Sequence, residues 1–310
     1  MRGSLSCRVI KDLVMVLVAI PLYAYSGMQS GALSQALADA NDRVDAMERI
    51  RLVMYQEIRS PTARQPGGGY GHVYHDYQML QIVTTFHNLL APPRRGGRTA
   101  PAPEDVNYMI RMLENEKEWK AKDVFKIVLT FVGVQDYADN VVELIEEKRQ
   151  GQQVRRAAIN ALRHIDYAAA IPVFIEALTD TSGEPAPYIN RAAGTTLYIY
   201  PAQRAAAYAL RDYGVPVQKV ANGSYIEKYE ADRDRAASVL ASRLEESCCE
   251  KQALLFLHSI IRLGGEGAIK AVQNYIREND NEPEKQDIIA ESKRLLHEFG
   301  AEGIRVGTEN

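Results

Sequence analysis

Cysteine is scarce in this sequence: Cys7, Cys248 and Cys249 are the only three among 310 residues. So few cysteines cannot staple a disulfide scaffold, and the adjacent pair lacks the C-x₂-C spacing of a zinc site. Cys248 and Cys249 either form a vicinal disulfide or remain two thiols. The fold must therefore rest on the burial of apolar side chains, which make up 46% of the chain.

A surplus of positive charge is also lacking. The chain has 37 Lys and Arg residues against 40 Asp and Glu residues, which gives a formal net charge of −3. Proteins that bind nucleic acid need basic surfaces, because contacts to phosphates supply much of their affinity. We therefore expect no nucleic-acid partner.

Only the N-terminus carries an apolar run that suggests a membrane. This run extends from Leu13 to Tyr25 and follows Arg2, Arg8 and Lys11. It is shorter than the roughly 20 residues of a comfortable membrane span and has the layout of a signal peptide. We predict that residues 1–26 are an export signal, either cleaved or kept as an inner-membrane anchor. The rest of the chain is then periplasmic or otherwise extracytoplasmic and touches the membrane only through this segment.

Residues 27–103 are predicted to form an N-terminal helical region with two linkers, 61–71 and 91–103, which are rich in Pro and Gly. A helix is expected over about 30–59, where apolar residues recur at steps of three and four and only Arg51 interrupts the stripe. Such a helix either dimerises as a coiled coil or docks on the rest of the chain. Additional apolar residues beside the stripe favour docking.

A second helix is expected after the first linker, and it carries the one cluster that resembles a site. His72, His75 and Asp76 stand at i, i+3 and i+4, so a helix would direct them to one side. Two histidines and a carboxylate can bind a metal with an open position. The alternative is a polar helix start, in which Asp76 favours the positive end of the helix dipole.

From Trp119 onward the sequence repeats itself. Laying segment 121–150 over segment 151–180 places Val124 on Val154 and Asp136-Tyr137-Ala138 on Asp166-Tyr167-Ala168. A further first helix is expected at 203–213 and a further pair at 251–279. A last, truncated copy is expected to turn at Gly300 to Ile304, as the earlier pair does at Gly264 to Ala268. Repeated helix pairs of this length indicate a solenoid over residues 104–310.

The pattern from Val154 to Leu178 resembles a HEAT repeat, of the bacterial kind related to phycobilin-lyase-type repeats. The resemblance implies an all-α fold, a right-handed alpha-alpha superhelix, and protein binding more often than catalysis. In one enzymatic branch, deoxyhypusine hydroxylase, HEAT arrays carry His-Glu pairs that hold iron. Only His297-Glu298 matches that feature here, so the branch is rejected.

We therefore expect a non-enzymatic scaffold without a cofactor that binds another protein. A concave helix face would present Glu143, Glu147 and Glu176, and the insertion at 181–201 would present Tyr188, Tyr198 and Tyr200. The alternative is a metal- or tetrapyrrole-handling protein, similar to a bilin lyase, that uses His72, His75 and Asp76. The sequence does not indicate an oligomeric state.

Overall fold

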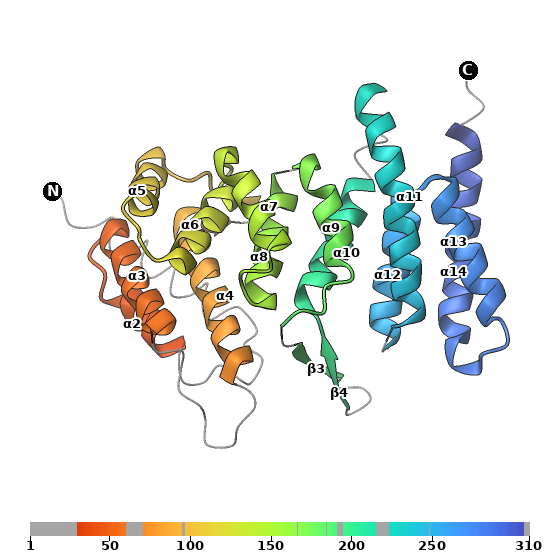
Figure 1. Ribbon diagram of the computed structural model, residues 1–310, viewed down its shortest axis with the longest axis horizontal. Coiled ribbons are helices and arrows are strands. Elements are labelled where there is room, and N and C mark those ends of the chain that lie inside the picture. Colours follow the sequence, from red (N-terminus) through yellow and green to blue (C-terminus); the bar gives the residue numbers. More distant parts are fainter. Residues whose placement is uncertain are drawn as a thin grey trace. The chain divides into compact units, whose positions relative to one another are not determined.

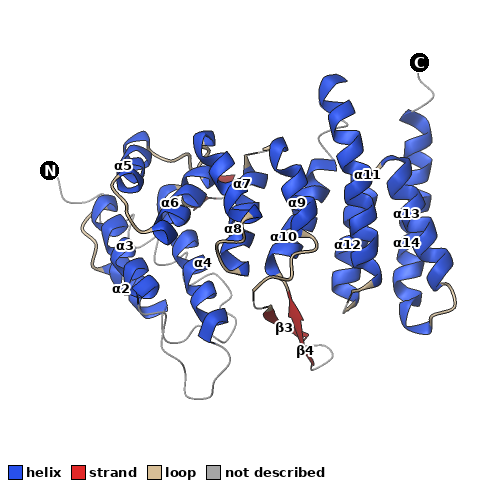
Figure 2. Cartoon of the chain, viewed as in Figure 1, coloured by secondary structure: helices blue, strands red, loops and turns tan. Residues whose placement is uncertain are grey.

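The computed structural model describes residues 30–306 apart from 60–70, 95–96, 166, 184, 191–194, 215–222 and 248. Within these residues the chain forms thirteen α-helices and two antiparallel hairpins (Figure 2). The all-α prediction is thereby confirmed for the described part. The chain divides into two compact units, Met1–Ile165 and Asp166–Asn310, and each is described by itself. The predicted export signal, 1–26, lies outside the described residues.

The first unit contains seven of the described helices and one short hairpin (Figure 1). α4 lies at its centre and packs against α3, α6 and α8. Phe86 of α4 meets Phe125 of α6 edge to face, with ring centroids 5.7 Å apart, and both side chains are fully buried. The elements are α2 (Ser30–Ala38), α3 (Arg43–Arg59), α4 (Gly71–Leu90), β1 (Pro93–Arg94), β2 (Gly97–Arg98), α5 (Pro103–Glu114), α6 (Trp119–Phe131), a 3₁₀ turn at Gln135–Tyr137, α7 (Ala138–Glu146) and α8 (Gln152–His164).

The prediction of one continuous helix over 30–59 is wrong. The chain leaves the helix after Ala38 and starts α3 at Arg43. Asp42 and Asp45 explain the break, because the Asp42 carboxylate accepts the backbone N–H of Asp45 at 2.8 Å, while the Asp45 carboxylate accepts that of Asn41 at 2.9 Å. Asp42 thus acts as the N-cap of α3, and Asp45 holds the residue before the cap, so the two carboxylates together start a new helix.

The predicted apolar stripe packs inside the chain. Met47 and Met54 of α3 have no exposed surface, and α3 packs against α2 and α4. Val44, another member of the stripe, is exposed. A stripe that is buried within one chain, and broken where the helix breaks, supports docking rather than a coiled coil.

The structure describes most of the second predicted linker but almost none of the first. Residues 60–70, nearly all of the first linker, lie outside the described residues. The second linker, 91–103, contains the β1–β2 hairpin. From it the Arg98 guanidinium donates to Asn88 Oδ1 at 3.0 Å and to the Ala91 carbonyl at 2.9 Å. Arg98 thus satisfies polar groups at the C-terminal end of α4, where a cation is favoured.

The predicted recurrence of a helix pair is present, but its register differs from the predicted one by three positions. Helix, 3₁₀ turn and helix start at 119, 135 and 138, and again at 152, 168 and 171. In this register buried positions coincide, for example Ala121 with Val154, Val124 with Ala157, Val128 with Ala161, Leu129 with Leu162, and Val141 with Phe174. A shift of three positions turns a helix by most of one full turn, so both alignments overlay similar apolar faces.

The second unit begins with a 3₁₀ turn and contains five further helices after α9. α12 packs against α10, α11, α13 and α14. The predicted helices at 203–213 and within 251–279 are confirmed, but α11 was not expected, and the predicted turn at Gly300 to Ile304 lies inside α14. The elements are Ala168–Ala170, α9 (Ile171–Ala177), β3 (Ala186–Asn190), β4 (Thr195–Ile199), α10 (Pro201–Gly214), α11 (Gly223–Glu245), α12 (Glu250–Leu263), α13 (Gly265–Asn279), a 3₁₀ turn at Pro283–Lys285 and α14 (Gln286–Val306).

Candidate functional site

The predicted metal cluster lies at the start of α4, as expected. His75 Nδ1 lies 2.9 Å from Glu57 Oε1 of α3, and Glu57 is buried. The backbone of His72 belongs to α4, but its side chain lies outside the described part of the structure. His75 is therefore already engaged by a carboxylate from the neighbouring helix.

Asp76 serves the backbone of α8. Its two carboxylate oxygens accept the N–H groups of Gln153 at 2.6 Å and Val154 at 3.2 Å. These are among the N–H groups that a helix start leaves without an internal partner, so Asp76 acts as a cap supplied from another helix. Burial raises the pKa of Asp76, while the two backbone N–H groups and the nearby Arg155 act against that rise.

Among the described residues, no group of three His, Cys, Asp or Glu side chains is arranged to hold a metal. The carboxylate of Asp76 and the ring of His75 have the protein partners given above. No observation on the described residues favours a metal or tetrapyrrole, and with the His72 side chain undescribed the metal site stays a prediction.

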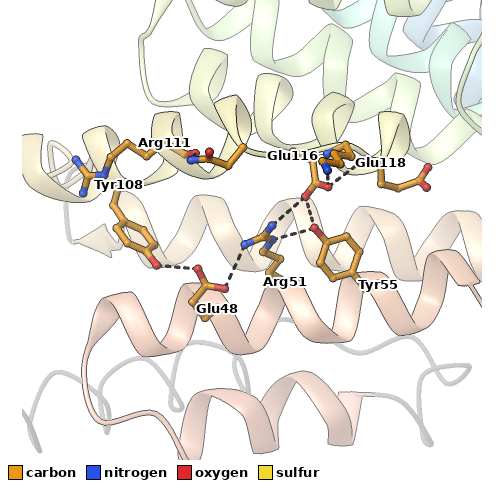
Figure 3. Close-up of polar contacts among 9 residues, drawn as sticks. Glu48, Arg51, Tyr55, Tyr108, Arg111, Glu116 and Glu118 are labelled. Carbon is orange, nitrogen blue, oxygen red and sulfur yellow. Dashed lines mark hydrogen bonds and ion pairs between the residues drawn. The ribbon is translucent and has the colours of Figure 1, made fainter.

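A polar network joins α3 to α5 and to the turn that precedes α6 (Figure 3). Tyr55 donates its hydroxyl to Glu116 Oε2, and Arg51 Nε donates to the Tyr55 hydroxyl at 3.0 Å. Arg51 also pairs with Glu116 at 3.5 Å and with Glu48 at 3.4 Å. Tyr108 of α5 donates to the other oxygen of Glu48 at 2.7 Å. Arg51, which interrupts the apolar stripe in the sequence, is thus the centre of this network.

Glu116 is the buried carboxylate of the network. Burial by itself would raise its pKa, but hydrogen bonds from Tyr55 and from the N–H groups of Glu118 and Lys117 outweigh burial and lower the pKa. Burial and the bond to Glu116 raise the pKa of Tyr55, which keeps its hydroxyl protonated and suited to donate. The network therefore links α3 to α5 and to the turn before α6, and its tyrosine is not activated as a base or nucleophile.

The predicted acidic residues are all exposed, but they belong to both units. Glu143 lies on the exposed side of α7, and Glu147 lies one turn later, at the C-cap of that helix. Glu147 pairs with Arg149 at 3.1 Å. Glu176, on α9, pairs loosely with Arg235 of α11 at 3.8 Å within the second unit. The structure thus brings Glu143 and Glu147 together.

The insertion at 181–201 forms the β3–β4 hairpin, which Figure 1 shows as an arm extending away from α9 and α10. Tyr188 is paired in register with Leu197, and Tyr198 with Pro187. Residues opposite each other share a face and neighbouring residues alternate, so positions 188 and 198 fall on opposite faces of the hairpin. Tyr200 is half-buried beside the start of α10. The register therefore places positions 188 and 198 on different faces, and the role of the three tyrosines in partner binding stays a prediction.

Two exposed apolar side chains were missed by the sequence analysis. Trp119, the only tryptophan, is 47% exposed at the start of α6, and Leu52 is 59% exposed on α3. The Lys120 ammonium lies 5.6 Å from the centre of the Trp119 ring. Tryptophan is enriched among residues that carry binding energy at interfaces. The signal that the sequence offered for this surface was its single tryptophan, at the start of the repeat region.

Comparison with known proteins gives no family. No protein-family model matches the chain, and no curated protein matches it at a significant level. The described helices include none that is long and apolar enough to cross a membrane.

Proposed function

We propose that this protein is a HEAT-like helical-repeat scaffold without enzymatic activity, built as a right-handed superhelix, that binds another protein. The proposal is supported by the recurrence of helix, 3₁₀ turn and helix, which start at 119 and again at 152, followed by the helices α10 to α13. Repeats of this kind are stacked modules whose exposed helices form extended binding surfaces.

The β3–β4 hairpin is the observation that carries the proposal. A two-stranded hairpin is at best marginally stable in water unless further strands or a helix cover it. Here the main packing of each strand is against the other strand. An arm of this kind on a helical scaffold is suited to contact a partner, since inserted loops in repeat proteins often carry recognition.

The second surface in the proposal is the concave helix face, to which the exposed side of α7 is assigned. Glu143 and Glu147 are exposed there, and Asp136 and Asp139 precede them on the same segment. A partner with a basic surface is the one that such a segment attracts. The place of action is proposed as the cell envelope, because residues 1–26 have the layout of an export signal.

The experiment is a capture of partners from the envelope fraction with the tagged full chain, followed by affinity measurements with the purified partner. Two variants test the two surfaces: replacement of 186–199 by a Gly-Ser linker, and Glu143→Lys combined with Glu147→Lys. The matched control is Glu278→Lys combined with Glu284→Lys, which makes the same charge change at two exposed residues of the second unit.

We expect each test variant to weaken the captured complex by about tenfold or more, and the control by less than about threefold. Circular dichroism must show equal helix content in all variants. Partner capture that neither test variant weakens would overturn the assignment of these surfaces, and a purified chain that turns over a substrate would overturn the non-enzymatic assignment.

A further inference from the structure

The two strands of the hairpin differ in what their outer edges offer. In an antiparallel ladder, two residues that lie directly opposite each other form one of two kinds of pair. Either they exchange both backbone hydrogen bonds, or both direct their backbone N–H and C=O groups away from the partner strand. Pro187 lies opposite Tyr198 and has no N–H, so this pair is of the second kind. The nitrogen of Pro187 therefore faces the outer edge of β3. That of Pro185, two residues earlier, faces the same way, so this edge lacks a donor at two successive outward positions and keeps the one of Ile189.

The outer edge of β4 has its donors. The same rule directs the backbone N–H and C=O of Tyr198 away from β3, and likewise those of Thr196, two residues earlier. β4 contains no proline and no charged residue, and all of its residues except Leu197 are strong strand formers. Natural proteins protect exposed edges with proline, lysine or bulges. Within the described residues the sheet has only these two strands, and the edge of β4 has no such protection.

The geometry points to a second copy of this chain as the strand that pairs with β4. An antiparallel pairing centred on Leu197 places Thr196 of each copy opposite Tyr198 of the other, where both residues direct their backbone groups outward. It also places Thr195 opposite Ile199. These are β-branched and aromatic combinations, which stabilise cross-strand pairs, and no like charges oppose each other.

This pairing closes on itself. It produces a sheet of strand order β3-β4-β4-β3, in which both outer edges are the proline-bearing edges of β3. Because two of the three outward positions on each of those edges lack an N–H, the edges pair poorly with a further strand, and the assembly stops at a two-fold dimer rather than growing into a fibre. Four strands also give the hairpin the lateral support that two strands lack. Pairing along the strand edge leaves both faces of the sheet outside the new contact, so the dimer goes beyond the proposed function and is compatible with it.

The first test compares two proline variants by analytical ultracentrifugation of the purified full chain over a range of concentrations. Tyr198→Pro removes an outward N–H from β4. Its matched control, Ile189→Pro, removes an outward N–H from β3, because Ile189 stands two residues from Pro187. We expect a dimer for the natural sequence, a dissociation constant raised about tenfold or more in Tyr198→Pro, and a change of less than about twofold in Ile189→Pro. All variants keep residues 1–29, so any association through that segment is common to them.

The second test uses charge. Thr196→Lys with Tyr198→Lys places like charges opposite each other in the dimer, and so does Thr196→Glu with Tyr198→Glu. Each double variant is expected to be monomeric alone, and an equal mixture is expected to form a heterodimer. A natural chain that stays monomeric, proline variants that weaken association equally, or a mixture of folded charge variants that fails to associate would each overturn the proposal. Loss of the captured partner in Tyr198→Pro, with a monomeric natural chain, would instead assign the edge to that partner.

Discussion

The Asp76 carboxylate occupies the space that a side chain on Gly151 would need. A Cβ built on Gly151 would overlap the carboxyl group of Asp76, whose oxygens accept the N–H groups of Gln153 and Val154. Gly151 has an ordinary φ of −66°, so its role is to leave room and not to adopt an unusual backbone. Because residue 151 is a glycine, Asp76 of α4 can cap α8, the first helix of the repeat that resembles a HEAT repeat.

Gly151→Ala and Asp76→Ala are each expected to lower the free energy of unfolding by about 1–2 kcal/mol. The first change crowds the carboxylate, and the second removes a cap. Once the carboxylate is gone, an alanine at 151 fits, so the double variant should lose clearly less than the sum. Urea denaturation of the four proteins measures the coupling. Strictly additive losses would show that the two residues do not share this space.

His87 makes stability depend on pH. The ring is buried and stacks on Phe131 with centroids 4.5 Å apart, and its Nε2 has no hydrogen-bond partner among the described residues. Burial, with the nearby Arg98 and His164, lowers its pKa from 6.5 to about 4. The folded state therefore disfavours the proton, and this group reduces stability progressively as pH falls from about 6.5 to about 4, by about 3 kcal/mol at most.

His87→Phe should flatten the dependence of the unfolding free energy on pH across that window. Phenylalanine preserves the stacking and does not titrate. His297→Gln is the matched control, because it also removes a histidine, but from an exposed position on α14. Denaturation curves recorded from pH 7 to pH 4 test this, and an unchanged slope in His87→Phe would contradict it.

Tyr55→Phe is expected to cost about 1–2 kcal/mol, because it removes a donor to the buried Glu116. Tyr77→Phe makes the same chemical change on an exposed side chain of α4 and should cost less than about 0.5 kcal/mol. Chemical denaturation of both variants decides the matter. Equal losses of unfolding free energy would mean that the hydrogen bond from Tyr55 to Glu116, drawn in Figure 3, stabilises the protein no more than the exposed hydroxyl of Tyr77 does.

The glycines that start α13 differ in what they tolerate. Gly265 has φ +84°, and a Cβ there would also lie 2.6 Å from Arg233 Cζ of α11. Gly267 lies within α13 without a positive φ, and its Cβ would meet the side chain of Asp234, an exposed residue whose carboxylate is the nearest group. We expect Gly265→Ala to cost about 1–2 kcal/mol and Gly267→Ala less than half of that, measured by thermal and urea unfolding. The reverse order would refute this account.

Apolar periodicity predicted most helices of the repeat region but not their register. Val124 can be laid on Val154 or on Ala157 with nearly the same buried faces, because the two choices differ by less than one helical turn. Only the ends of the helices, set by turns and caps, distinguish the two registers. α11 was missed for a related reason: Glu227 to Arg235 is rich in charged residues, and among the residues of this helix whose burial is described the first buried one is Ala236.

The sequence by itself determined that this protein is helical, that helix pairs recur after Trp119, and that no excess of basic charge marks it for nucleic acid. These properties follow from the order and composition of residues close together in the chain. Tertiary structure alone decided that Asp76 caps α8, that Arg51 joins α3 to the turn before α6, and that positions 188 and 198 fall on opposite faces of a hairpin. Each of these depends on which distant residue or strand position lies opposite, and local periodicity carries no information about that choice.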